Sequence, residues 1–169
     1  MPSRFCFLFV AAALVAASVQ AGTPQSLTAQ VGDIAFESGD EEIHFVPIGD
    51  TFSLSASTRG AAAWPPPKTR IDRLAITCDG FVEGRPLVRD HRDFERSTCS
   101  VTFERGTQPM GGAAEAEFTL DKDAADNRFE IEAAAGKVYK GRFAFRLKAA
   151  DGSTVSVTAG RFTVEDRQL

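Results

Sequence analysis

The sequence has few of the side chains that most often carry catalysis or bind metals. Its 169 residues include two histidines, three cysteines, one tryptophan and one tyrosine. Two histidines and a pair of bridged cysteines cannot supply a tetrahedral zinc site. The only asparagine, Asn127, precedes arginine and phenylalanine, so the chain has no N-x-S/T sequon and no N-glycosylation is expected. A net charge of −4 at pH 7 argues against a nucleic-acid partner.

Long apolar runs are also missing, apart from one at the N-terminus. An arginine precedes the apolar residues 5–17, and the compact residues 19–21 follow, which is the order of a cleavable signal peptide. The run is shorter than the roughly twenty residues of a membrane-spanning helix. Gly22, not cysteine, follows the expected cleavage point, so no lipid anchor is expected. We predict a helical signal peptide at residues 1–21 and a periplasmic or secreted mature protein at 22–169, with no membrane span after cleavage.

Cleavage leaves an even number of cysteines. Cys6 lies in the discarded segment, and Cys78 and Cys99 remain. An even count in an oxidising compartment predicts a disulfide between them, the alternative being two free buried thiols. Closing a loop of this length stabilises a fold by about 3 kcal/mol in the chain-entropy description.

The mature chain consists of short runs in which apolar and polar residues alternate, separated by Gly, Pro, Asp and Ser. A period of two is typical of β-strands, and no long stretch has a helical stripe. We therefore predict one all-β domain of about nine or ten strands, an antiparallel β-sandwich with a barrel as the alternative. Loops are expected at residues 59–69, 79–98 and 104–113.

The clearest pattern is a three-stranded meander at residues 128–164. A three-residue loop at 135–137 would oppose opposite charges on the outer face. A second loop at 150–152 would form another hairpin. Beyond Gly160 the inward positions change from odd to even numbers, which indicates a β-bulge. The expected cross-strand pairs are Phe129 with Phe143, Ala133 with Tyr139, Glu130 with Arg142, Glu132 with Lys140, Leu147 with Val155, and Phe145 with Val157.

Two segments have a familiar pattern: the opening LTAQVGDIAF and the C-terminal GRFAFRLKAADGSTVSVTAGRFTV. Both resemble segments of small bacterial secreted or lipoprotein-type β-sandwich domains of uncharacterised function. Together they cover about a third of the mature chain. The resemblance implies a β-sandwich in the bacterial envelope; it implies no activity and supplies no site residues.

Catalysis has one candidate residue. His91 lies beside Asp90 and Asp93 with serines nearby, so a Ser-His-Asp hydrolase can be drawn from these letters. A triad is defined by geometry, however, and no G-x-S-x-G motif is present. We rank a hydrolase last and expect a protein that is not an enzyme and needs no cofactor.

A calcium site has one candidate segment. Asp121, Asp123 and Asp126 place carboxylates between two strands, as calcium loops do. The segment lacks the glycine turn and the distal glutamate of an EF-hand loop, and aspartates also form ordinary turns. We therefore expect no metal site.

Binding residues are expected in two loops. Trp64 precedes three prolines in a segment that is expected to be exposed, where a tryptophan can serve as a contact residue; the alternative is that it folds back over the end of the sandwich. The long charged loop at 79–98 carries Arg85, Arg89 and Arg92, and long loops are often functional, the alternative being a partly disordered, solvated loop. We therefore expect a non-enzymatic binding protein of the bacterial envelope whose partner is another envelope or extracellular protein. The alternative is a hydrophobic-ligand carrier with a cavity inside a β-barrel.

Overall fold

The structure is a computed structural model that describes residues 24–168, except 97 and 109–111. The signal peptide predicted at residues 1–21 lies outside the described residues. No helix among the described residues has the length and apolar character needed to cross a membrane.

Strands make up most of the described chain, as the alternating pattern predicts. Eleven strands, one 3-10 helix and one short α-helix are formed. In chain order they are β1 (Ser26–Val31), β2 (Ile34–Ser38), η1 (Asp40–Glu42), β3 (Ile43–Ile48), β4 (Thr51–Ser57), β5 (Ile71–Asp79), β6 (Leu87–Arg89), α1 (His91–Glu95), β7 (Cys99–Thr107), β8 (Ala116–Leu120), β9 (Arg128–Ala135), β10 (Val138–Ala149) and β11 (Thr154–Glu165).

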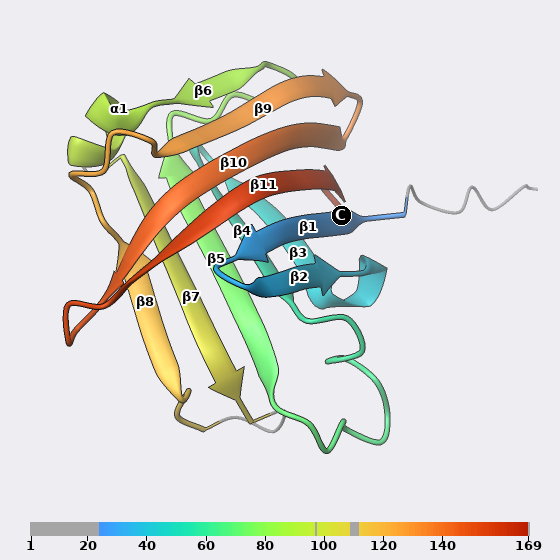
Figure 1. The fold of residues 1–169 in the computed structure, drawn as a ribbon. Coiled ribbons are helices and arrows are strands. Elements are labelled where there is room, and N and C mark those ends of the chain that lie inside the picture. Colours follow the sequence, from blue (N-terminus) through green and yellow to red (C-terminus); the bar gives the residue numbers. More distant parts are fainter. Residues whose placement is uncertain (1–23, 97, 109–111, 169) are drawn as a thin grey trace, which may run out of the picture.

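All pairings are antiparallel and join the strands into one sheet in the order β2-β1-β11-β10-β8-β7-β5-β4-β3. The first part of β10 pairs with β9 instead of β8, and β6 pairs with the outer edge of β9. Figure 1 shows the sheet curling so that β1, β2 and β9–β11 lie in front of β3–β5 and β7. The all-β prediction is confirmed, and the sheet is nearly closed, like a barrel.

Alternation along each strand directs apolar side chains into the barrel. On β5, Leu74, Ile76 and Cys78 are at most 1% exposed, whereas the intervening Ala75 is exposed. Aromatic rings fill much of the interior and contact one another. Ring contacts link Phe81, Phe52, Phe129, Phe162, Phe143, Phe145 and Phe94 in that order.

The predicted meander is present, with one error in its first hairpin. Phe129 pairs with Phe143 and Glu130 with Arg142, as predicted. The turn, however, contains only residues 136–137, with Gly136 at φ 61°. An extra residue at Glu132 restores the register. The predicted pairs of Ala133 with Tyr139 and of Glu132 with Lys140 are therefore wrong, since Lys140 pairs with Ala133.

The second hairpin and the bulge follow the prediction. Leu147 pairs with Val155 and Phe145 with Val157. The ladder then shifts by one residue before Gly160, where Ala159 has a φ of 52°. This shift brings the even-numbered Phe162 and Val164 into the core. They are 4% and 0% exposed.

Two of the three predicted loops contain regular structure. Segment 79–98 holds β6 and the helix α1, which is capped by Asp90 and buries Phe94. The 104–113 prediction is wrong at its start, because β7 continues to Thr107. The described chain between β4 and β5 has no strand or helix, as predicted for 59–69.

Candidate functional site

The two remaining cysteines hold the segment between them at its base. Cys78 on β5 lies directly opposite Cys99 on β7, and the two form the predicted disulfide. Beside this bond the Asp79 N–H donates a hydrogen bond to the Thr98 carbonyl at 2.8 Å. We call residues 79–98 the cap segment. Disulfides persist in oxidising compartments, which fits an extracellular or periplasmic protein.

The cap segment closes one end of the barrel through Phe81. This side chain is 3% exposed, and its ring centre lies 5.8 Å from that of Phe52 and 5.5 Å from that of Tyr139. The Phe81 N–H also donates to the Asp50 carbonyl at 2.7 Å, which joins the cap segment to the β3–β4 turn. Burial raises the pKa of the Tyr139 hydroxyl, so this ring beneath the cap segment is neutral.

Large apolar side chains are exposed near this end of the barrel. Ile48 at the end of β3 is 70% exposed, and Val82 and Val88 in the cap segment are 52% and 51% exposed. Ile48 and Val82 flank the backbone hydrogen bond between Asp50 and Phe81. Among the described residues, Trp64 is the one other large apolar side chain with comparable exposure. We call Ile48, Val82 and Val88 the cap surface.

The three arginines predicted to make contacts differ in how they are held. Arg89 folds back over Gly80 and donates from Nη2 to the Asp79 carbonyl at 2.6 Å, so it supports the base of the cap segment. Arg85 is exposed in a turn in which its N–H donates to the Val82 carbonyl. Arg92 is exposed on α1. Arg85 and Arg92 thus remain open to a partner, whereas Arg89 is engaged within the cap segment.

Trp64 lies at the other end of the barrel. It is 87% exposed, in the connection between β4 and β5, as predicted. Figure 1 shows this connection at the lower end of the molecule and β6 and α1 at the upper end. The nine residues of β5 separate the two ends by about 30 Å. Trp64 and the cap-segment arginines therefore cannot form one compact contact surface.

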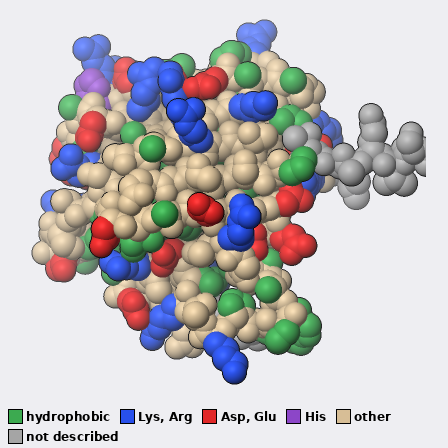
Figure 2. Space-filling model, turned by 45° about the vertical axis from the view of Figure 1, so that its right-hand side comes forward, with side chains coloured by type: hydrophobic (Ala, Val, Ile, Leu, Met, Phe, Trp, Pro, Cys, Tyr) green, Lys and Arg blue, Asp and Glu red, His purple; other side chains and the backbone are tan. Residues whose placement is uncertain are grey.

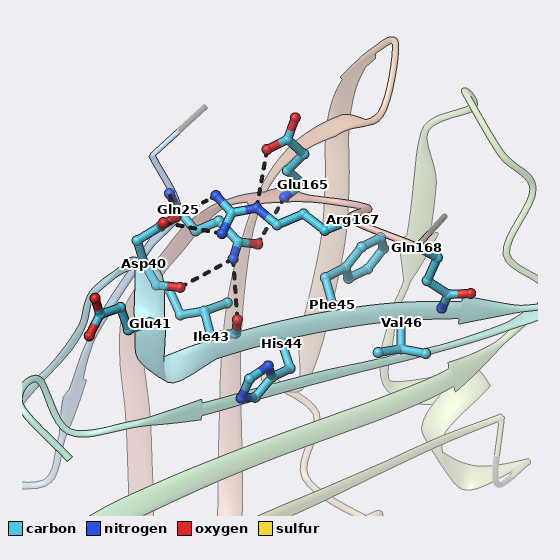
Figure 3. Close-up of a pocket in the computed structure, with 10 residues that line it drawn as sticks. All are labelled: Gln25, Asp40, Glu41, Ile43, His44, Phe45, Val46, Glu165, Arg167 and Gln168. Atoms are coloured by element: carbon cyan, nitrogen blue, oxygen red, sulfur yellow. Dashed lines mark hydrogen bonds and ion pairs between the residues drawn. The ribbon is translucent and has the colours of Figure 1, made fainter. Parts of the chain in front are cut away.

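A third feature is the seam at which the sheet fails to close by strand pairing. A hollow of about 350 Å³ lies between the free edge of β3 and the end of β11. Figure 3 shows the residues that line it. The Gln25 side chain, in a residue that is 5% exposed, bridges the gap. Its Nε2 donates to the Ile43 carbonyl at 3.2 Å, and its Oε1 accepts from the Glu165 N–H at 3.0 Å. One amide thus replaces a pair of ladder hydrogen bonds.

An ion pair covers the same seam. The Arg167 guanidinium donates to both carboxylate oxygens of Asp40, at 2.6 and 3.1 Å, and also to Glu165. The hydrogen bond from Arg167, with a second from the Gln25 N–H, holds the pKa of Asp40 below its usual range. Gln168 continues the closure by donating to the Pro47 carbonyl at 3.2 Å. These polar groups are satisfied within the chain, so the seam is best explained as barrel closure.

The hydrolase hypothesis gains no geometric support. His91 begins α1 and makes no hydrogen bond to a hydroxyl or carboxylate of any residue that the structure describes. The carboxylates beside it have structural roles: Asp90 accepts from the Arg92 N–H, and Asp93 accepts from the Asp90 N–H. Ser97 lies outside the described residues.

The three aspartates proposed for calcium are not brought together. No group of three His, Cys, Asp or Glu residues suited to a metal occurs in the described parts of the chain. The Asp126 carboxylate instead lies 3.3 Å from the Arg146 guanidinium. The Asp121 carbonyl accepts from the Asn127 side chain, whose oxygen accepts from the Arg146 N–H. This network explains the segment as a turn between strands.

The packed interior gives no support to the alternative that the protein carries a hydrophobic ligand. The series of ring contacts described above occupies the space in which a barrel would hold a hydrophobic ligand. Dense packing of this kind is ordinary for a protein core. The carrier requires an enclosed apolar cavity and gains no support from this arrangement.

Comparisons with protein families, with curated proteins and with solved structures found no match. The resemblance to small secreted β-domains therefore stays a prediction.

Proposed function

We propose that this chain is an exported, non-enzymatic binding protein of the bacterial envelope that contacts another protein through the cap surface. The observation that carries the proposal is the clustering of exposed apolar side chains near one end of the barrel. Ile48 belongs to the turn that the cap segment contacts, and Val82 and Val88 lie on the cap segment itself. Exposed apolar side chains within a polar surround are typical of protein-interaction sites.

The way in which the cap segment is held supports the same proposal. A disulfide closes its base, and Phe81 anchors its first turn in the core. Val82 and Val88 are therefore presented on a preorganised backbone, which lowers the entropic cost of binding. The exposed Arg85 beside Val82 adds a charged group of the type that is enriched in interfaces. Export is supported by the signal-like N-terminal sequence and by a disulfide.

The proposal can be tested by capture of partners from an envelope extract. The bait would be the protein purified after export, in its oxidised form. We expect a double variant, I48S/V82S, to lose the partner that the wild-type protein retains, because both exposed contacts become polar. The matched control is W64A, which removes an even more exposed apolar side chain from the opposite end and should retain the partner.

Two results would contradict the proposal that the cap surface contacts the partner. Equal recovery of every captured protein by the wild type and by I48S/V82S would remove it as a contact. Loss of the partner in W64A but not in I48S/V82S would show that the contact lies in the β4–β5 connection. Circular dichroism of each bait would establish that the variants fold, since all substituted side chains are more than half exposed.

A further inference from the structure

A separate hollow lies on the outer face of β9, β10 and β11. Its volume is about 200 Å³. The small residues Ala144, Ala159 and Gly160 line it. The bulge before Gly160 interrupts the ladder opposite Ala144, and the small side chain of Ala144 leaves room above the backbone. The buried Phe143 also lines the hollow. The polar residues that line this hollow are Arg128, Arg142 and Arg161.

Two of these arginines are held in place by one buried carboxylate. The side chain of Glu130 is 8% exposed and accepts hydrogen bonds from both Arg128 and Arg142. The hydrogen bonds from Arg128 and Arg142 lower the pKa of Glu130 to about 2, so the carboxylate is charged at neutral pH. Arg142 also lies 3.0 Å from Glu132, whose side chain is 47% exposed. Two guanidinium groups are thereby positioned beside the hollow.

The third arginine has no such partner. Arg161 on β11 lies directly opposite Arg142 on β10, so the two side chains project from the same face. Arg161 is exposed and forms no ion pair with any residue in the described part of the chain. Like charges that face each other across a ladder are destabilising. An anion between them would remove this cost.

The charge and the donors match one kind of anion. Arg128, Arg142 and Arg161 together with Glu130 carry a net charge of +2, and the exposed Glu132 offsets part of it. A phosphomonoester carries a charge of about −1.5 to −2 at pH 7 and three strong acceptor oxygens. Arginine binds phosphate oxygens in paired, planar geometry. Figure 2 shows lysine and arginine side chains gathered across the upper part of the molecule, at the height of β9 and β10 in Figure 1.

We propose that the hollow between Arg128, Arg142 and Arg161 binds the phosphate group of a phosphomonoester. Ala144, Ala159 and Gly160 offer a small apolar surface for the carbon atoms that carry the phosphate. Val88 of the cap surface lies directly opposite Glu130 and so projects from the same face, but no residue of the cap surface lines the hollow, and the proposed site does not depend on them.

The direct test is calorimetric titration of the whole exported protein with glycerol 3-phosphate at low ionic strength. We expect saturable binding that weakens about tenfold or more in R161Q, because a charge-assisted contact is lost. Without ligand, R161Q should melt no lower than the wild type, since the substitution removes a like-charge pair. The control R105Q neutralises an exposed arginine on β7 and should bind like the wild type.

Lipid vesicles distinguish a lipid headgroup from a soluble phosphomonoester as the ligand. Phosphatidylcholine vesicles with and without phosphatidic acid would be compared with soluble glycerol 3-phosphate. Binding to either phosphate form that depends on Arg161 supports the site and identifies its source. Unchanged affinity in R161Q, equal loss in R105Q, equally tight binding of acetate, or no binding of either phosphate form would overturn the proposal.

Discussion

Glu130 is the charged residue whose burial has the clearest energetic consequence. Its carboxylate lies under two arginines that are themselves about half exposed. The carboxylate is stabilised by these donors, while water still solvates much of each guanidinium. Removing the carboxylate would leave the two cations near each other and near Arg161. The residue therefore links the stability of the sheet to the proposed phosphate site.

We predict that E130Q lowers the free energy of unfolding by about 1–3 kcal/mol at pH 7, because charge-assisted hydrogen bonds are lost. The pKa of Glu130 is about 2 in the folded protein and about 4.3 in an unfolded chain. Its contribution is therefore complete above the unfolded value and is lost as the pH falls towards 2. The difference between the two proteins should shrink over that range.

Urea denaturation at a series of pH values would measure this difference. The exposed Glu95 offers a control, and E95Q should follow the wild-type profile closely. A constant gap between E130Q and the wild type from pH 7 to pH 2.5 would show that the carboxylate does not act through its charge.

Sequence reasoning found part of this cluster. Alternation predicts that Glu130 faces Arg142, and the structure confirms the pair. It does not place Arg161 opposite Arg142, because that pairing depends on the exact position of the bulge before Gly160. The ion pair between Arg128 and Glu130 was not predicted either, although residues two apart on a strand project from the same face.

At the scale of elements, the cap segment departs most from its predicted form. Its mixed charge predicts a loop, yet it contains β6 and α1. Each is short and buries a single large apolar side chain, Leu87 or Phe94. One apolar residue cannot form a periodic pattern, so the sequence gives no signal for either element. Both are defined by their contacts with the barrel.

We predict that the double variant C78A/C99A loses about 3 kcal/mol of unfolding free energy, in line with closure of a loop of this length. Alanine is chosen because both cysteines are buried and a serine hydroxyl would lack a partner. Hydrogen exchange should accelerate more in the cap segment than in β10 and β11. Reduction of the wild-type protein should give the same pattern.

The outcome against this prediction would be an equal rise in exchange throughout the sheet. That result would mean that the disulfide stabilises the whole fold and not the attachment of the cap segment.

At the scale of the whole molecule, closure of the barrel depends on side chains. The end strands β2 and β3 are joined by η1. The free edge of β3 meets the C-terminal residues through Gln25 and Gln168, and Arg167 bonds to Asp40 of η1. Pro47 has no N–H to offer at this edge, which discourages further strand pairing. Strand addition by a partner is therefore disfavoured at the β3 edge.

We predict that Q25A lowers the free energy of unfolding by about 1–3 kcal/mol, because the Ile43 carbonyl and the Glu165 N–H both lose a partner at a buried site. Hydrogen exchange should show faster opening of β3 than of β10. The comparison variant is Q168A, which removes an exposed hydrogen bond of the same seam and should have a much smaller effect.

Equal losses in Q25A and Q168A would indicate that burial of the Gln25 amide contributes nothing to closure. An effect spread evenly over all strands would show that the seam does not open separately.

The sequence by itself determined the all-β class, most strand positions, the disulfide and the second C-terminal hairpin. These follow from local rules: a period of two, an even cysteine count and glycine-containing turns. Only the tertiary structure decided that the sheet curls into a nearly closed barrel, that Trp64 and the cap segment lie at opposite ends, and that three arginines surround one hollow. These features depend on pairings between distant residues and on a single-residue bulge, and a shift of one residue reverses the face of every side chain beyond it.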